Sequence, residues 1–289
     1  LFREYWNGDW PMKVSLRRAR PEDARACGQI CYDAFKGIAE DHNFPPDFPT
    51  AEVSTGLLSD CFSRDDLYTV VAESAGQIVG SNVLWEHGDV AAVGPITVDP
   101  TAQRSSAGRQ LMADILERAS SRGFERVRLV QAAFNNLSMA LYAKLGFDVR
   151  EPLSVMQGAP LHISIPGYEV RSVTAEDLYA CDRLCVQVHG HRRQGELADA
   201  MQQGTALLVE HEGSITGYAT GIAFFGHAVA QTNQDLKALI GAVDEYAGPG
   251  FLLPTRNAEM LRWCLEHGLR IVQPMTLMSR GPYQEPRGS

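Results

Sequence analysis

The fold follows from one stretch of the sequence, Val98-Asp-Pro-Thr-Ala-Gln-Arg-Ser-Ser-Ala-Gly-Arg-Gln-Leu111. It continues a run, Val90–Val98, that has the pattern of a buried strand, and Pro100 ends that strand because proline cannot donate to the ladder. Small residues come next, and apolar residues then recur every fourth position from Leu111, which predicts a helix. A strand, a loop of small residues and a helix N-terminus form a geometry that binds a pyrophosphate, because unpaired backbone N–H groups point at the anion. An ordinary strand-to-helix turn rich in serine accounts for this segment equally well.

The spacing of the loop excludes two common phosphate loops, since neither Gly-x-x-x-x-Gly-Lys-Ser/Thr nor Gly-x-Gly-x-x-Gly is present. The loop resembles instead the acetyl-CoA loop of the GNAT N-acetyltransferase superfamily, Gln/Arg-x-x-Gly-x-Gly/Ala. Here that pattern reads Gln-Arg-Ser-Ser-Ala-Gly over residues 103–108, after a Val-x-Pro as in the family. Ser106 replaces the first glycine. Its N–H remains available, but its side chain can crowd the diphosphate and weaken affinity.

The resemblance implies how acetyl-CoA would be held. Main-chain groups before the loop would meet the pantetheine amides, the loop and two arginines would hold the diphosphate, and Asn135 would hold the pantetheine from the other side. The cofactor-binding residues implied in this way are Ile96, Thr97, Val98, Gln103, Arg104, Ser105, Ser106, Ala107, Gly108, Arg109, Asn135 and Ser138. The chemistry needs no metal, and no cysteines and histidines have the spacing of metal ligands.

A second segment, residues 135–147, reads Asn-Asn-Leu-Ser-Met-Ala-Leu-Tyr-Ala-Lys-Leu-Gly-Phe and resembles the family's other signature, Asn…Leu-Tyr-x-Lys-x-Gly-Phe. Helix capping alone explains Asn135 and Gly146. It does not explain Tyr142, although a lone tyrosine there is more often a half-buried core residue. In the implied reaction an amine attacks the thioester carbonyl and CoA thiolate leaves. A phenol of pKa about 10 can protonate a sulfur of pKa about 8.5, so Tyr142 is the predicted catalytic residue.

The residues leave the general base open. Many relatives carry Glu or His on the strand before the loop, at places that correspond here to Ala92 and Gly94, neither of which accepts a proton. The Gly94-Pro95 pair interrupts this strand and predicts a bulge, where a backbone donor can meet the developing oxyanion. Weak candidates for the base are Glu86, His87 and Asp89 at a predicted turn and Asp41 and His42 in loop 40–48. A solvated turn or an ordinary surface loop explains each of them as well.

The chain contains two copies of one pattern. Three segments of the first half recur in the same order in the second half, at offsets of 154, 137 and 122 residues. They are Arg17–Cys31 with Arg171–Cys185, Glu73–Gly80 with Glu210–Gly217, and Asn135–Gly146 with Asn257–Gly268. Because the order is kept while the offset falls steadily, duplication explains the series better than chance. In the second copy, Cys264 stands at the tyrosine position and residues 226–240 carry neither the loop pattern nor an arginine pair.

Composition sets outer limits on function. The 289 residues are 45% hydrophobic without a run long enough to span a bilayer, which predicts a soluble globular protein. A net charge of −9 argues against a nucleic-acid partner and suits a cationic substrate. The six cysteines form no Cys-x-x-Cys, so buried free thiols are expected, and with no recognisable signal peptide they predict a cytoplasmic protein.

Together these patterns predict an α/β (α+β type) fold of two tandem GNAT-like domains, each a mixed twisted sheet with helices on both faces. The expected divisions are a tail at 1–12, a GNAT domain at 13–157, a linker at 158–167 and a degenerate GNAT-like domain at 168–289 that binds no cofactor and walls the acceptor cleft. In the first copy the predicted helices are Pro21–Phe35, Ala51–Phe62, Ala107–Arg122 and Asn136–Leu145, and the strands are Val14–Ala19, Leu67–Glu73, Gln77–Trp85, Val90–Val98 and Arg126–Gln131.

The predicted function is transfer of an acetyl group from acetyl-CoA to a primary amine, on a small molecule or a peptide, by direct attack in the N-terminal domain. A non-catalytic acyl-CoA-binding or sensing protein is the alternative, favoured by Ser106 and by the missing strand base. A structural scaffold is a third reading. The sequence leaves the acceptor unnamed, and it fits a monomer or a homodimer without a membrane partner.

Overall fold

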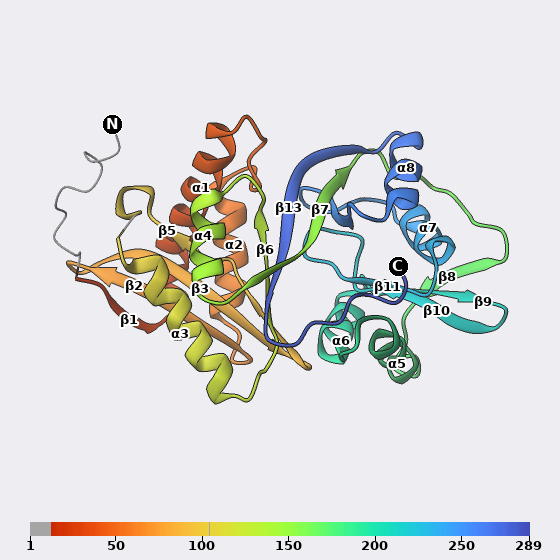
Figure 1. Cartoon of the computed structure of the whole chain (residues 1–289), viewed down its shortest axis with the longest axis horizontal. Helices are drawn as coiled ribbons and strands as arrows, with labels where there is room; N and C mark the ends of the chain where they lie inside the picture. The colour runs from red at the N-terminus through yellow and green to blue at the C-terminus, as the bar shows by residue number, and fades with distance from the viewer. Residues whose placement is uncertain (1–12, 104) are drawn as a thin grey trace.

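An antiparallel meander joined to one parallel strand builds the N-terminal half of the main sheet (Figure 1). The computed structural model describes residues 13–103 and 105–289, apart from the side chain of His87. The strands run in the order β1 (Ser15–Arg18), β2 (Leu67–Ser74), β3 (Gln77–His87), β4 (Val90–Val93) and β6 (Val127–Ala132). Two helices, α1 (Ala24–Asp41) and α2 (Ala51–Phe62), cover one face. The other face packs against α3 (Ala107–Ser121) and α4 (Asn136–Lys144). The expected mixed sheet with helices on both faces is confirmed.

Strands β4 and β6 pair over only two positions, Ala91 with Val127 and Ala92 with Arg128. Beyond Val93 the chain turns away at Gly94, whose φ of +129° lies in a region that favours glycine. It then continues along the same edge of β3 as β5 (Thr97–Val98), since β2 occupies the opposite edge. The run predicted as one strand, Val90–Val98, is therefore two short strands, and the sheet opens between β4 and β6. This opening leads directly to the loop before α3.

The second half repeats the order of elements. A four-stranded sheet in the order β11-β10-β9-β8 is formed by β8 (Tyr168–Ser172), β9 (Leu207–His211), β10 (Ser214–Ala219) and β11 (Ala228–Ala230). Helices α5 (Leu178–His189) and α6 (Gln194–Gln203) pack on one face, and α7 (Asn233–Ala242) and α8 (Ala258–Glu266) pack on the other. Within the described residues, no helix is both long enough and apolar enough to cross a bilayer.

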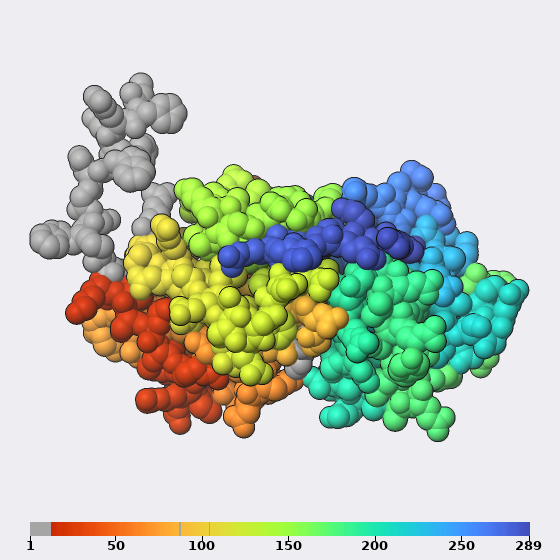
Figure 2. Space-filling view, turned by 60° about the horizontal axis from the view of Figure 1, so that its bottom comes forward, coloured from red at the N-terminus to blue at the C-terminus, as the bar shows by residue number. Residues whose placement is uncertain are grey.

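The two halves exchange their last strands. Strand β7 (Asp148–Gln157), the last of the first half, pairs with β12 (Phe251–Pro254) of the second half. Strand β13 (Arg270–Arg280), the last of the second half, pairs with β6 of the first half. The two exchanged strands also pair antiparallel with each other, and Figure 1 shows them running side by side between the halves. The chain segment that follows β13 lies across the boundary in the space-filling view (Figure 2). The division at residues 158–167 stays a prediction, and residues 1–12 lie outside the described part.

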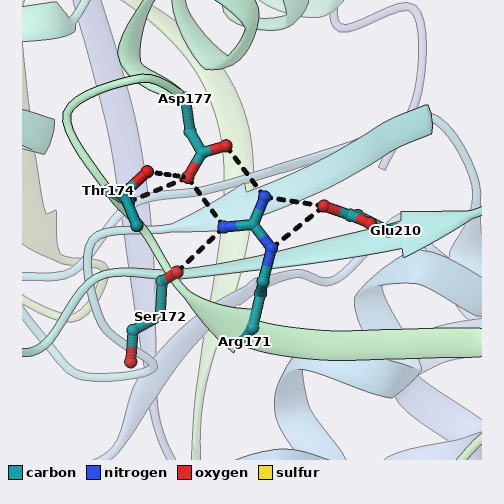
Figure 3. Close-up of polar contacts among 5 residues, drawn as sticks. All are labelled: Arg171, Ser172, Thr174, Asp177 and Glu210. Atoms are coloured by element: carbon teal, nitrogen blue, oxygen red, sulfur yellow. Dashed lines mark hydrogen bonds and ion pairs between the residues drawn. The ribbon is translucent and has the colours of Figure 1, made fainter. Parts of the chain in front are cut away.

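An arginine network marks the duplication at atomic level. In the second half, Arg171 binds both oxygens of Asp177 at 2.7 and 2.8 Å and Glu210 at 2.6 Å (Figure 3). In the first half, Arg17 binds both oxygens of Asp23 at 2.7 and 2.9 Å and Glu73 at 2.8 Å. Each network ties the first strand of its half to the start of the first helix and to the second strand. The recurring sequence pattern is thus a recurring structural clamp.

Loss of one clamp is expected to cost stability in a pH-dependent way. Arg171 holds the pKa of the Asp177 carboxyl well below its usual value, mainly through their hydrogen bonds. Because the folded-state pKa is lowered, this contribution is present above the ordinary Asp pKa of about 3.9 and is lost as the pH falls through the folded value. Asp177→Asn should therefore lower the free energy of unfolding by about 2 kcal/mol at pH 7. Urea unfolding of the variant and the parent at pH 7 and below pH 4 measures this.

The matched variant Asp23→Asn should behave in the same way, because Arg17 likewise lowers the pKa of Asp23. A stability gap that stays constant from pH 7 to pH 3 in both variants would contradict the ion-pair explanation.

Candidate active site

A cleft of about 2280 Å³ opens between the halves and reaches the gap between β4 and β6. Strands β6, β13 and β7 contribute to its walls, together with α1, α2, α4 and the loop before α3 from the first half and residues 220–228 from the second half. The cleft brings together most of the predicted site, namely Ile96, Thr97, Val98, Gln103, Ser105, Gly108, Arg109, Asn135, Ser138 and Tyr142. Ser106 and Ala107 do not line it, and Ala107, the first residue of α3, is buried in the core of the first half. Arg104 lies outside the described residues.

The N-terminus of α3 presents backbone donors to this cleft. Ser105 Oγ accepts the Ala107 N–H at 3.2 Å, whereas the N–H groups of the first helical turn have no partner within a helix. Gln110 Nε2 donates to Ser106 Oγ at 2.6 Å, so the hydroxyl of Ser106 is held against its own helix. Arg109 occupies the third helical position, where a cation opposes the helix dipole. An anion bound there would remove that conflict.

Two buried polar side chains in the gap between the strands have no partner among the described residues. Thr97 on β5 is 4% exposed and Gln131 on β6 is 6% exposed, and both line the cleft. The hydroxyl of Thr97 and both amide atoms of Gln131 make no hydrogen bond in the described part of the chain. Buried amides require partners, and the two amides of a pantetheine arm supply such groups. Acetyl-CoA therefore fits the residues present, and Gln131 is a site residue that sequence reasoning missed.

Helix α4 positions the predicted acid. Asn135 Oδ1 accepts the Ser138 N–H at 3.1 Å and caps the helix. Tyr142, one turn further on, is 6% exposed and lines the cleft. Burial raises the pKa of Tyr142 to about 12, and a side-chain hydrogen bond with Ser138 acts in the opposite direction. The phenol therefore keeps its proton at neutral pH, as a proton donor must.

Of the weak candidates for the general base, some lie outside the cleft and one lines it. Glu86 is ion-paired with Arg118 at 2.6 Å, Asp89 accepts the Arg192 N–H at 3.0 Å, and neither lines the cleft. His42 is exposed, and its Nδ1 lies 2.9 Å from the Ile38 carbonyl oxygen. Asp41 does line the cleft. The side chain of His87 is outside the described part.

Asp47 is the carboxylate that sequence reasoning passed over. It lies in loop 40–48, lines the cleft, and accepts a hydrogen bond of 2.5 Å from Gln273 Nε2 on the exchanged strand β13. Burial raises the pKa of Asp47, against the effect of this hydrogen bond. The local sequence carries one usable signal, because the prolines at 45, 46 and 49 fix the backbone on both sides.

The equivalent place in the second half is closed by the protein's own groups. Helix α7 begins with a capping box, in which Asp235 Oδ2 accepts the Thr232 N–H at 2.9 Å. Asp235 is the third residue of α7, the position that Arg109 takes in α3, and it also bonds Thr216. Asn257, the counterpart of Asn135, donates its amide to Asn233 at 2.8 Å. A carboxylate therefore already occupies the helix end where a diphosphate would bind.

Comparison with known proteins places this geometry in context. The model of the acetyltransferase (GNAT) family matches residues 35–147. Over 128 residues the chain is 27% identical to a protein of Azospirillum brasilense named IAA acetyltransferase. The match covers 44% of this chain and 84% of that protein.

Solved structures that match nearly the whole chain include the following two. A protein of Pyrococcus horikoshii, described provisionally as an acetyltransferase, superposes with a TM-score of 0.72 at 17% identity, covering 100% of this chain and 95% of that one. A tandem GNAT protein from the clavulanic acid biosynthesis pathway superposes with a TM-score of 0.55 at 16% identity, covering 94% of this chain and 100% of that one. At these identities the likeness establishes the fold, which is that of a tandem GNAT protein.

Gly108 offers a test of the site that does not disturb the fold. A Cβ added there would meet Val98 and Leu141 at 3.5 and 3.7 Å, which is ordinary contact. Gly108→Ala should therefore leave the melting temperature unchanged or higher, since alanine favours a helix. The added methyl lies in the cleft, so the Kd for coenzyme A should rise about tenfold, a change of about 1.4 kcal/mol. Calorimetric titration with coenzyme A measures it.

Gly56→Ala is the matched control, because Gly56 lies in α2 with open space around its Cα and does not line the cleft. Equal affinities in the parent and both variants would remove Gly108 from the binding site.

Proposed function

We propose that this chain transfers an acetyl group from acetyl-CoA to a primary amine, with the active site in its N-terminal half, because residues 35–147 match the model of the acetyltransferase (GNAT) family. The observation that carries the proposal is one cleft that holds both the open N-terminus of α3 and the buried phenol of Tyr142. The first supplies backbone donors for a diphosphate. The second supplies a proton for a leaving sulfur.

Each residue has one role in this proposal. When bound, acetyl-CoA supplies an acetyl group activated as a thioester. The amides of the α3 turn and Arg109 hold the diphosphate, and Thr97, Gln131 and Asn135 hold the pantetheine arm. Asp47 accepts a proton from the incoming amine, since only the neutral amine attacks. Tyr142 donates its proton to the sulfur as the carbon–sulfur bond breaks, and the phenolate left behind takes up the proton that the nitrogen of the new amide loses. Asp47 then releases the proton of the original ammonium group to water.

The charge of the cleft supports an amine acceptor. Asp33, Asp41, Asp47 and Asp60 line it from α1, α2 and the loop between them. Carboxylates gathered in a cleft raise the local concentration of cations, and an alkyl amine is a cation in neutral solution. The second half, whose helix end is occupied by Asp235, is proposed to bind no cofactor and to wall the acceptor site. Six free, buried cysteines are compatible with the proposed cytoplasmic location.

A non-catalytic acyl-CoA sensor is the second candidate. It is favoured by Ala92 and Gly94, which line the cleft on and beside β4 and cannot act as bases. A sensor would bind coenzyme A without releasing thiol in the presence of any amine. Asp47, supplied from another element, removes the main argument for it.

Tyr142→Phe tests the proposed acid. The change removes one hydroxyl from a buried ring, and kcat for thiol release should fall about 100-fold while KM for acetyl-CoA changes little. Steady-state thiol release with a panel of primary amines measures both. Tyr246→Phe is the control, because Tyr246 is also buried but does not line the cleft. An unchanged kcat in Tyr142→Phe would contradict the assignment.

Asp47→Asn tests the proposed base through two opposite effects. Since burial raises the pKa of Asp47, the ionised carboxylate costs stability above that pKa, and the cost disappears below the ordinary Asp value of about 3.9. The variant should therefore melt higher than the parent at pH 7 and equally at pH 3, while kcat falls about 100-fold. Thermal melts and thiol release measure these.

Asp60→Asn removes another carboxylate of the same cleft, but an exposed one on α2. Its kcat should change by no more than a few fold. An equal loss in both variants would show that the cleft needs negative charge and no particular base.

A further inference from the structure

A half-buried arginine faces the cleft without a carboxylate partner among the described residues. Arg128 lies on β6 beside Ala92 of β4 and Ser279 of β13, and it lines the cleft. Its guanidinium stacks on the Tyr283 ring at 5.2 Å, and Nη1 lies 2.8 Å from His191 Nε2. Its Nε is buried and has no hydrogen-bond partner in the described chain. No salt bridge to Arg128 exists among residues 13–103 and 105–289, although an uncompensated buried charge is costly.

Three histidines of the second half gather beside this arginine. His189 and His191 lie at the end of α5 with ring centroids 6.0 Å apart, and His227, just before β11, lies 5.2 Å from His189. Desolvation, together with Arg193 and Arg128, lowers the pKa of His189 to about 4 and of His191 to about 3. All three rings are therefore neutral at pH 7. One ring nitrogen of each is buried and unpaired within the described residues.

The hydrogen bonds identify the kind of ligand that is missing. Arginine can only donate, so His191 Nε2 must accept from Arg128, and the proton of this neutral ring is then on Nδ1. Arg128 Nε–H is a buried donor without an acceptor on a side chain that lines the cleft, whereas His191, which does not line the cleft, holds the guanidinium from behind. A metal ion does not suit the place, because a guanidinium lies beside it and the described residues contain no group of three ligands that could hold one. An unpaired donor on a cationic side chain that lines the cleft calls for an anion.

We propose that Arg128 and the adjoining histidines bind a carboxylate of the acceptor, so that the amine substrate is an amino acid or another amino carboxylate. This inference rests on the proposed function for the position of the amine. Arg128 pairs with Ala92, two residues before the turn at Gly94 where the sheet opens. Two residues of a strand span about 7 Å, and the arginine side chain covers part of that distance. The anion site is therefore within reach of an amine on the same small molecule.

The lowered pKa of Arg128, about 10, agrees with a desolvated cation whose counter-ion arrives with the substrate. In this proposal Asp47 and Arg128 bind two different groups of the same acceptor molecule. The carboxylate on the first-half loop receives the amine, and the arginine on β6 receives the acid group. Both are reached from the same cleft.

Matched substrates test this assignment. Glycine, β-alanine and γ-aminobutyrate are each compared with their carboxamides, which keep the amine and lose the negative charge. In the parent protein, kcat/KM for the best carboxylate should exceed that of its carboxamide at least tenfold. Arg128→Met should bring this ratio to about 1, and Arg128→Lys should retain part of it. Arg150→Met is the control, because Arg150 stacks on the same Tyr283 ring but is paired with Asp148 and does not line the cleft.

A second readout needs no turnover. Removing an unpaired buried charge should raise the melting temperature, so Arg128→Met without ligand should melt roughly 2 to 4 °C higher than the parent. Sodium propionate should raise the melting temperature of the parent but not of Arg128→Met, with sodium chloride as the ionic-strength control. An arginine with a purely structural role would instead give a variant that melts lower.

The outcomes separate the two proposals. If amines are acetylated but the parent has the same kcat/KM for a carboxylate substrate and its carboxamide, the carboxylate site is wrong and the transferase stands. If no amine is acetylated but propionate stabilises the protein through Arg128, the anion site stands and the transferase fails. If inorganic phosphate stabilises the parent and propionate does not, the site takes a free phosphate, and the proposal of an acceptor carboxylate is overturned.

Discussion

The antiparallel pairing of β7 with β13 is the constraint on which the rest of the molecule depends. Each strand belongs by sequence to one half and is paired on its outer side with the other half. Side chains on opposite faces of β13 pack in two different clusters. Met278 packs in the core of the first half, and Met275 packs with residues around the cleft. Separating the halves would expose both sets of apolar side chains and break three ladders. The cleft is thus walled by a shared sheet whose geometry neither half sets alone.

This sharing explains why a half without cofactor machinery contributes to the site. Gln273 of β13 holds Asp47, and His191, just after α5, contacts Arg128. In both contacts a charged group of the first half meets an uncharged polar group of the second half. Burial shifts the pKa of Asp47 upward and that of Arg128 downward, in each case disfavouring the charged form, and Arg193 of the second half lowers the pKa of Arg128 further. The second half therefore tunes the charges that the first half carries.

Local features of the fold could be predicted from sequence, because they depend on near neighbours. Helix α2 has the predicted bounds, and the paired Arg17 and Arg171 patterns correspond to equivalent clamps. Pairing over long distances could not be predicted, because the alternation in residues 148–157 and 270–280 specifies a strand but not its partner. The same limit hid Asp47 and Arg128, whose importance depends on residues 226 and 63 positions away. Tyr142 was found because its signature is local, and its role remains a proposal.

One position shows clearly how the two copies differ at the helix that follows the loop. The third residue of α3 is Arg109, and the third residue of α7 is Asp235. A helix N-terminus carries partial positive charge, so a carboxylate there is satisfied within the protein, whereas an arginine raises the local potential further. The carboxylate of Asp235 closes the site in the second half and stabilises the helix. Arg109 in α3 is stabilised when an anion binds, and a diphosphate would interact favourably with both the helix N-terminus and the arginine.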